Sequence, residues 1–311
     1  MKKELLTRFM EKRIVELKKD GTAHVYQSTL NRLKKFMNGR EITFSQLTPE
    51  WLALFEQKLL ADQLKWNTIS TYMRMLRSVY NQALERGVAT YVPRLFNKVH
   101  TGIDCPVKRA VSPEVICKLM TDQKPLPEKL AFSRDLFVLL FLLRGMPFVD
   151  LAFLRRCDLQ GNVITYHRRK TSRKLTVVVG KEAMEIIRRY MYAIPDSPYL
   201  FPIIQNPGEN EYGQYTRMLR LLNHRLTQVA NTLGIRERLS TYVARHTWAT
   251  TALRQNYNSS LICNAMGHSS VKVTETYFQP YRDDEVNRMN RSLITYILSK
   301  KKRGIDKNIR S

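Results

Sequence analysis

Three side chains late in the chain have the types and spacing for chemistry on a phosphate ester: Arg245, His268 and Tyr277. An arginine stays charged and presents a planar fork of N–H donors that fits two phosphate oxygens. An imidazole adds a further donor, and a tyrosine hydroxyl becomes a nucleophile where positive charge favours the phenolate or a base takes its proton. The segment from Ser240 to Tyr277 therefore holds groups suited to attack on a phosphodiester.

The sequence around these residues resembles the second half of the active site of tyrosine recombinases, the phage integrase family. ARHTWAT contains the arginine, MGHSS the histidine, and TETYF the tyrosine, nine positions after the histidine. The resemblance implies a site-specific DNA recombinase that needs neither metal nor cofactor. Tyr277 would form a 3′-phosphotyrosyl bond while Arg245 and His268 hold the charge on phosphorus. Tyr257 and Tyr281 are rival nucleophiles by proximity, and the family spacing favours Tyr277.

The resemblance also implies a further arginine, and here the sequence departs from the family pattern. LLRGMPFVDL aligns by its carboxylate, Asp150, but the position expected to hold arginine is Pro147, which carries no charge. The nearest substitute is Arg144, and Arg155 and Arg156 are further options. The RGM form with a shifted arginine resembles a subgroup associated with mobile elements and invertible DNA segments in Bacteroides-like bacteria.

Two other positions complete the catalytic set that the resemblance implies. Lys170, in the basic stretch HRRKTSRK, matches the lysine that protonates the departing 5′ oxygen. An ammonium group can give up a proton during the reaction, whereas a guanidinium cannot. The first position of the family's His-x-x-Arg-His box is Tyr242, and a phenol is a poor proton acceptor near neutral pH. The Tyr277 hydroxyl must then lose its proton with weaker assistance, or it gives the proton to His268.

The composition favours a nucleic-acid partner and excludes a disordered chain. The chain has 311 residues with 52 Lys plus Arg against 27 Asp plus Glu, a net charge of +25, and 43% hydrophobic residues. Each phosphate that a cation neutralises releases counterions, which makes binding salt-dependent with a slope of roughly −0.9 per contact on duplex DNA. Four widely spaced cysteines without a CxxC pair argue against a zinc site.

The sequence shows no membrane or export signal. The longest apolar run, LFVLLFLL at residues 136–143, is far shorter than the ~20 residues needed to span a bilayer, and it predicts a buried helix. The N-terminus has charges scattered through it and no apolar signal core. We therefore expect a cytoplasmic, nucleoid-associated protein with no membrane partner.

Hydrophobic periodicity predicts a mainly α protein of two domains. The pattern predicts a helical domain over residues 1–104 and a mixed, mostly helical domain over residues 105–311, with a small β-hairpin at 162–179 and a tail helix from about residue 283. The family resemblance implies that the first is a core-binding (SAM-like) domain and the second the tyrosine-recombinase catalytic domain. In the first domain we expect helices over 2–20, 22–38, 49–61 and 67–86. Gly21 and Gly39 would lie at helix ends, and Asn67 would cap the fourth helix.

Two basic surfaces are predicted to contact DNA. The polar face of the fourth helix contains no acid, and its short hydroxyls and long guanidiniums suit phosphates and guanine edges; a solvated face is the alternative. The candidates are Asn67, Ser70, Thr71, Arg74 and Arg77 on this helix, and Arg168, Arg169, Arg173 and Lys174 on the hairpin.

The resemblance implies a homo-tetramer on double-stranded DNA that carries specific recombination sites, because strand exchange needs four protomers on two duplexes. The tail helix could dock into a neighbouring protomer, and accessory DNA-bending proteins are a further partner class. Two alternatives remain open: a type IB topoisomerase-like enzyme that nicks and closes DNA, and a degenerate integrase that only binds it. Integration, excision and inversion differ only in where the sites lie and how they point.

Overall fold

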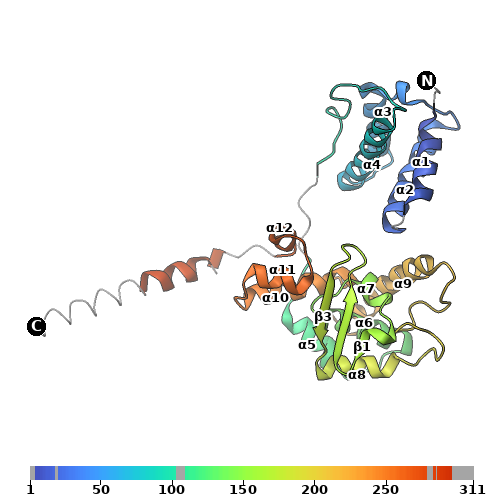
Figure 1. Cartoon of the computed structure of the whole chain (residues 1–311). Coiled ribbons are helices and arrows are strands. Elements are labelled where there is room, and N and C mark those ends of the chain that lie inside the picture. Colours follow the sequence, from blue (N-terminus) through green and yellow to red (C-terminus); the bar gives the residue numbers. More distant parts are fainter. Residues whose placement is uncertain (1–3, 18–19, 103–108, 279–282, 285, 296–311) are drawn as a thin grey trace, which may run out of the picture. The chain divides into compact units, whose positions relative to one another are not determined.

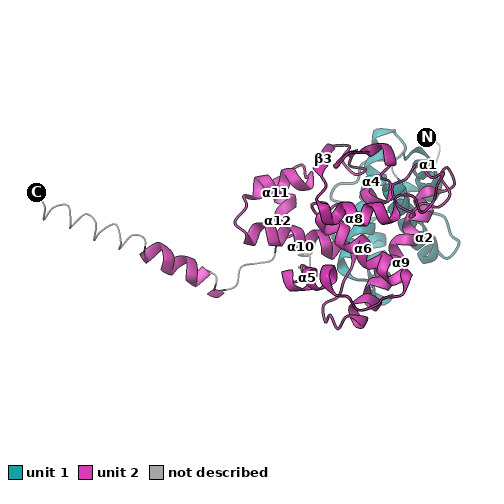
Figure 2. Ribbon diagram, turned by 90° about the horizontal axis from the view of Figure 1, so that it is seen from below, with its two compact units in different colours: residues 1–106 teal, residues 107–311 magenta. Residues whose placement is uncertain are grey.

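The computed structural model of the chain describes residues 4–17, 20–102, 109–278, 283–284 and 286–295. The chain forms two compact units, Met1–Pro106 and Val107–Ser311 (Figures 1 and 2). The predicted junction at residues 104–108 lies outside the described residues.

The first unit is a bundle of four helices, α1 (Leu6–Glu16), α2 (Asp20–Met37), α3 (Pro49–Ala61) and α4 (Trp66–Glu85), with a short 3-10 turn η1 at Phe44–Gln46. Helix α3 begins as its sequence predicts: Thr48 Oγ1 accepts the Trp51 N–H at 3.2 Å, and Pro49 occupies the first helical position. The four predicted helices are confirmed, and their apolar faces share one core.

Two predicted helix ends in this unit are wrong. Gly21 lies within the first turn of α2 rather than at a helix end, because the helix begins at Asp20, whose carboxylate suits the positive end of the helix dipole. Helix α4 begins at Trp66 with Lys65 as the N-cap residue, so Asn67 is already helical. Gly87, with φ +68°, follows the end of α4, as expected for a left-handed C-terminal residue.

The two faces of α4 follow the predicted pattern with one exception. Ile69, Met73 and Leu76 are fully buried, and Asn67 and Arg77 are exposed. Ser70 is also fully buried, because its hydroxyl donates a hydrogen bond to the Gly102 carbonyl of the chain that follows the bundle. In this structure Ser70 fastens that segment to α4 and is not available to DNA.

The second unit is built around α6 (Glu128–Leu142), which packs against α5 (Pro113–Thr121), α8 (Lys181–Tyr190), α9 (Glu211–Thr232) and α10 (Thr241–Arg254). Leu136, Phe137, Leu139 and Leu140 are all fully buried, which confirms the predicted core helix. Of the helices in the described ranges, none is both long and apolar enough to cross a membrane.

A three-stranded antiparallel sheet lies beside these helices, in the order β1 (Leu159–Gln160), β2 (Val163–His167), β3 (Lys174–Val178). The register pairs Thr165 with Thr176 and His167 with Lys174, so the predicted hairpin and its turn are confirmed. Ser172 in that turn has φ +57°. The strand β1, which follows the 3-10 turn η2 (Arg156–Asp158), was not predicted.

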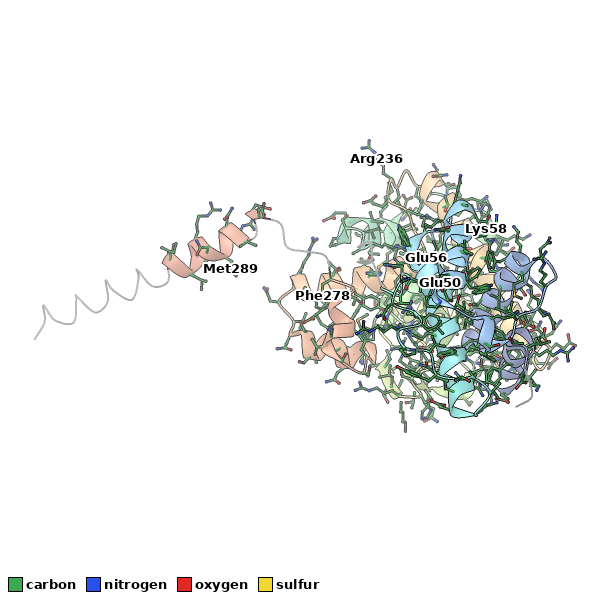
Figure 3. The ribbon with its side chains drawn as sticks, turned by 90° about the horizontal axis from the view of Figure 1, so that it is seen from above. Glu50, Glu56, Lys58, Arg236, Phe278 and Met289 are labelled. Atoms are coloured by element: carbon green, nitrogen blue, oxygen red, sulfur yellow. The ribbon has the colours of Figure 1, made fainter. Side chains whose placement is uncertain are left out.

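Three helices complete the catalytic part of this unit: α7 (Phe148–Ala152) after α6, and α11 (Ser259–Met266) and α12 (Val271–Glu275) after α10. Beyond them, residues 283–284 and 286–295 are helical, as predicted for the tail. Val286, Met289 and Leu293 are about half exposed and recur at helical spacing, and Figure 3 shows Met289 projecting from this segment. The basic end that follows lies outside the described residues.

Candidate active site

Helix α10 contributes the largest share of the candidate site. Tyr242, His246 and Thr250 are four residues apart and therefore lie in a row along the helix, next to Arg245. His246 Nδ1 and Thr250 Oγ1 both donate hydrogen bonds to the backbone carbonyl of Tyr277, at 3.2 and 3.1 Å. This row fixes the backbone position of the predicted nucleophile.

Arg245 lies at the centre of the site and is buried, with 3% of its surface exposed. Its Nη1 donates a hydrogen bond to the Gly145 carbonyl, and its Nη2 donates one to the Met266 carbonyl at 3.0 Å. The same Nη2 lies 2.5 Å from His268 Nε2. Burial lowers the pKa of Arg245 from its ordinary value. These acceptors are all neutral: two backbone carbonyls and an imidazole nitrogen.

The turn after α6 passes close against α10 because of Gly145. Its φ is +65°, and a Cβ at this position would lie 3.1 Å from the Arg245 Cα atom. Arg144, just before it, also has positive φ, +60°, and its Nη1 donates to the Thr176 carbonyl of β3 at 3.2 Å. The turn therefore places the side chain of the predicted substitute arginine against strand β3. Pro147 is the N-cap residue of α7.

A second glycine turn places His268. Gly267 ends α11 with φ +66°, and a Cβ there would lie 2.7 Å from Leu175 Cδ1 and 2.8 Å from Arg168 Cδ of the hairpin. Only glycine lets this turn pass the hairpin without displacing it. His268 is 5% exposed, and burial together with the charges of Arg245, Arg168 and Lys170 lowers its pKa to about 3.

The predicted nucleophile joins the same cluster. Tyr277 is 9% exposed; its ring stacks on that of His268 with centroids 5.2 Å apart, and the Arg245 guanidinium lies 5.4 Å from the Tyr277 ring centroid. The Tyr242 hydroxyl donates a hydrogen bond to the Tyr277 hydroxyl at 3.0 Å. Burial is the main cause that raises the pKa of Tyr242, so this phenol stays a donor. The structure therefore brings Arg245, His268, Tyr242 and Tyr277 together.

Two of the hairpin cations predicted to contact DNA bond within the protein, although only Arg168 is buried and Arg173 is exposed. Arg168 is buried; its Nε lies 3.3 Å from Asp150 Oδ2, and its Nη1 donates to the carbonyls of Met266 and Gly267, both at 3.0 Å. Arg173 Nη1 donates to the His268 carbonyl at 2.8 Å. In this position the two guanidiniums are used within the protein and connect the hairpin to the turn that carries His268.

The other hairpin cations remain exposed at the turn: Arg169, Lys170 and Lys174. The Arg169 guanidinium lies 3.7 Å from the centroid of the Phe153 ring. Lys170 is close enough for its charge to lower the pKa of His268, so the predicted general acid belongs electrostatically to the cluster.

The sequence also offered Arg156 as an active-site cation, and Tyr257 and Tyr281 as nucleophiles. Arg156 donates to the carbonyls of Met191, Ile194 and Pro195, which removes it as an active-site cation. Tyr257 is exposed and lines an apolar pocket, and Tyr281 lies outside the described residues. Across the described ranges, no three His, Cys, Asp or Glu residues come together as a metal site would need.

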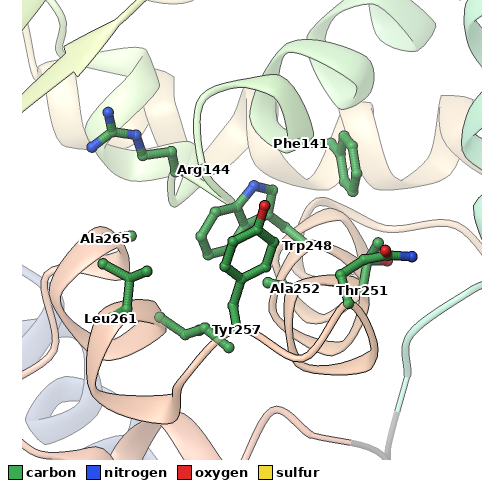
Figure 4. A pocket seen from close by; sticks show the side chains of 10 residues that line it. Phe141, Arg144, Trp248, Thr251, Ala252, Tyr257, Leu261 and Ala265 are labelled. Atoms are coloured by element: carbon green, nitrogen blue, oxygen red, sulfur yellow. The ribbon is translucent and has the colours of Figure 1, made fainter.

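That apolar pocket has a volume of about 380 Å³ and lies between the end of α6, α10 and α11. Its lining includes Phe141, Trp248, Tyr257, Leu261 and Ala265 (Figure 4). The Arg144 side chain, at its rim, extends away from this aromatic lining (Figure 4).

Two family models match the chain. One, described as the phage integrase SAM-like domain, matches residues 5–99, and the other, described as the phage integrase family, matches residues 109–283.

Individual proteins are similar over most of the length. A protein named tyrosine recombinase XerC, from Thermodesulfovibrio yellowstonii, is 22% identical over 278 residues, which cover 85% of this chain and 88% of that protein. The Tn1549 transposon integrase, solved in complex with transposon right end DNA, has a TM-score of 0.66 at 14% identity, covering 94% of this chain and 100% of that one. A lambda integrase tetramer bound to a Holliday junction has a TM-score of 0.64 at 12% identity, covering 91% and 80%. The two structural likenesses show a shared fold.

The contact of Gly267 with the hairpin predicts a stability difference between two glycine variants. Gly267→Ala should destabilise the chain by about 1–2 kcal/mol from left-handed strain and by a further ~1–3 kcal/mol from the collision with Leu175 and Arg168. Gly234→Ala is the matched control, because Gly234 has φ +65° and no atom lies within 4 Å of the point that its Cβ would occupy. Urea unfolding of the two full-length variants measures the difference; equal losses would contradict the packing role of Gly267.

Proposed function

The chain belongs to the phage integrase family and is a site-specific DNA recombinase; we propose that it cuts and rejoins DNA through a bond between Tyr277 and a 3′ phosphate. The observation that supports this mechanism best is the buried cluster in which the Tyr277 ring lies against both the Arg245 guanidinium and the His268 ring. A nucleophile, a permanent cation and an imidazole are thus close enough to act on one phosphorus.

In the proposed reaction the Tyr277 oxygen attacks the scissile phosphate, forming a phosphotyrosyl bond as the bond to the 5′ oxygen breaks. Arg245 and Arg144 hold the negative charge on the phosphorane oxygens, and Lys170 gives a proton to the leaving 5′ oxygen. The Tyr277 proton passes to neutral His268, and the imidazolium then stabilises the phosphorane as well. Preorganised donors of this kind are each worth on the order of 100-fold or more in rate.

The DNA contacts that we propose use the exposed and half-exposed residues of the two predicted surfaces. These are Asn67, Thr71, Arg74 and Arg77 on α4, and Arg169 and Lys174 on the hairpin. Arg74 is half-buried, with Nε 3.3 Å from the Ser70 carbonyl, and its guanidinium also reaches Thr71. The whole-chain charge of +25 favours the same partner, since cations on phosphates supply much of the affinity for DNA.

We further propose that four protomers assemble on two duplexes, with the tail of one protomer docked on the next. The tail offers an exposed apolar stripe of Val286, Met289 and Leu293, and the catalytic unit offers the apolar pocket lined by Trp248 and Leu261. An unpaired apolar stripe and an unfilled apolar pocket on identical protomers are complementary surfaces.

Tyr277→Phe should bind DNA with unchanged affinity and form no covalent adduct, because the variant lacks only the attacking oxygen. The substrate is a duplex that the full chain selects from a random-sequence library, nicked within its central region so that cleavage traps the adduct. Tyr257→Phe is the matched control and should form adducts like the natural chain. A persistent adduct with Tyr277→Phe would refute the assignment of the nucleophile.

Arg144→Ala should slow single-turnover cleavage of this nicked duplex by about 100-fold, since one preorganised cation is lost. Binding should change by only a few-fold. Arg155→Ala is the control, because Arg155 is exposed and its charge acts on Tyr199 and Glu211 rather than on the cluster. Wild-type cleavage by Arg144→Ala would show that Arg144 does not replace the arginine missing at Pro147.

Leu293→Asp should weaken assembly of two DNA-bound dimers by about 10-fold or more, because a charge would have to enter an apolar pocket. Binding to a single site should stay within a few-fold of the natural chain. Ser292→Asp adds the same charge off the apolar stripe and should assemble normally. Native gel electrophoresis with singly and doubly sited DNA separates the two steps, and equal effects of both variants would argue against tail docking.

A further inference from the structure

His268 lies between two hydrogen-bond partners, one on each ring nitrogen. Its Nε2 faces the Arg245 Nη2 at 2.5 Å, and its Nδ1 lies 2.8 Å from the hydroxyl of Thr274. Thr274 is fully buried in α12, and His268 is 5% exposed. Neither side chain can exchange its partner for water where it stands.

These contacts fix which nitrogen carries the hydrogen. A guanidinium nitrogen only donates, so Nε2 of His268 must accept from Arg245 and cannot itself be protonated. A neutral imidazole has one N–H, which must then be on Nδ1. Because a hydroxyl oxygen can accept, the Thr274 Oγ1 atom takes the Nδ1 hydrogen. The neutral form of His268 is in keeping with the burial that lowers its pKa to about 3.

We infer that Thr274 is a positioning residue for His268: its hydroxyl holds the hydrogen on Nδ1 and so keeps the Nε2 lone pair directed at the reaction centre. The inference rests on the proposed function, in which His268 receives the proton of the nucleophile. In the other tautomer, His268 Nε2 would already carry a hydrogen and could not accept the proton of Tyr277.

Thr274 also joins this ring to the nucleophile through the backbone. The Thr274 carbonyl accepts the Tyr277 N–H at 3.0 Å, while its side chain binds His268. Thr274 therefore supports the Nδ1–H form of His268 through its side chain. Its backbone carbonyl also begins the turn that carries Tyr277. This arrangement explains why a hydroxyl-bearing residue is buried three positions before the nucleophile.

The proton transfer in the proposed function is balanced. When a phosphate oxygen takes the Arg245 N–H, the Nε2 lone pair of His268 is released and accepts the hydrogen of the Tyr277 hydroxyl as the O–P bond forms. The imidazolium keeps its Nδ1–H on Thr274 and donates its new Nε2–H to the phosphorane. The positive charge that appears on the ring is stabilised by the negative charge on phosphorus.

Other charged and titratable groups around His268 affect its protonation. Arg245 on α10 and Arg168 and Lys170 on the hairpin oppose a positive charge, and Arg173 binds the His268 carbonyl. Cys263 on α11 also contacts that carbonyl, and the Tyr277 ring covers the imidazole face. Helix α12 itself carries Lys272 and Glu275, both exposed. None of these groups supplies an acceptor to Nδ1 in the described structure, and Thr274 does.

The activity test compares three variants on the nicked duplex. Thr274→Val keeps the volume and removes the acceptor, so single-turnover cleavage should fall by about 10- to 100-fold, as for other residues that orient a functional histidine. The acid limb of its pH–rate profile should move to lower pH, since the imidazolium loses a hydrogen bond. Thr274→Ser should restore both. Thr276→Val, two residues on and exposed, is the matched control and should change neither.

A second measurement reads the tautomer without DNA or activity. In the full chain labelled with ¹⁵N-histidine, and with the His268 signals identified by His268→Gln, the natural protein should show a neutral Nδ1–H ring. In Thr274→Val the Nε2–H form should become detectable, because Nδ1–H is left without an acceptor and only the Arg245 contact then opposes the change of tautomer. An Nε2–H ring in the natural protein, or cleavage by Thr274→Val at the natural rate and pH profile, would overturn the inference. An adduct with Tyr277→Phe would instead sink the proposed nucleophile and leave the tautomer result standing.

Discussion

The burial of one permanent cation, Arg245, constrains the rest of the catalytic unit. A guanidinium taken out of water without acceptors costs several kcal/mol, so the fold must bring oxygen atoms to it. The acceptors are the backbone carbonyl of Gly145, in the turn after α6, and that of Met266, at the end of α11 where carbonyls lack partners within the helix. Both turns must therefore approach α10 closely, and each has a glycine in a left-handed conformation at that point, Gly145 and Gly267. The two short motifs RGM and MGHSS therefore meet at the Arg245 guanidinium.

Because these acceptors occupy the hydrogen-bond donors of Arg245, the site is closed in this structure. Tyr277 is 9% exposed, its hydroxyl is bonded to Tyr242, and the donors of Arg245 are already in use. A phosphate oxygen is a stronger partner for a guanidinium than a neutral carbonyl, because opposite charges add a Coulomb attraction that is larger away from bulk water. The cation has already lost its water during folding. In the proposed mechanism, entry of the scissile phosphate therefore exchanges contacts with neutral acceptors for contacts with an anion.

Much of this arrangement could be predicted from the sequence, and the exceptions have physical reasons. Helical periodicity predicts the bundle and the buried α6, and spacing identifies the residues that cluster. The neighbouring arginines Arg168 and Arg169 are both predicted to contact DNA, yet the first is buried against Asp150 and the second is exposed. Adjacent residues at the end of a strand point in opposite directions, and composition cannot say which one faces the core. The prediction that Ser70 contacts DNA is wrong because its hydroxyl is bonded to Gly102, in the connection after the bundle. The periodicity of α4 does not predict the path of that connection.

Tyr242 shows how a departure from the family pattern fits the rest of the site. A histidine at this position could take a proton, whereas the half-exposed Tyr242 phenol, whose pKa is raised mainly by desolvation, keeps its proton and acts as a donor. Its hydrogen bond to the Tyr277 oxygen strengthens as negative charge develops on that oxygen, so Tyr242 favours ionisation of the nucleophile without receiving its proton. The proton needs another acceptor, and the neutral Nδ1–H form of His268 offers one at Nε2. With a donor in place of an acceptor at residue 242, the proposed mechanism assigns the proton transfer to His268, and the inferred role of the Thr274 hydroxyl follows from that assignment.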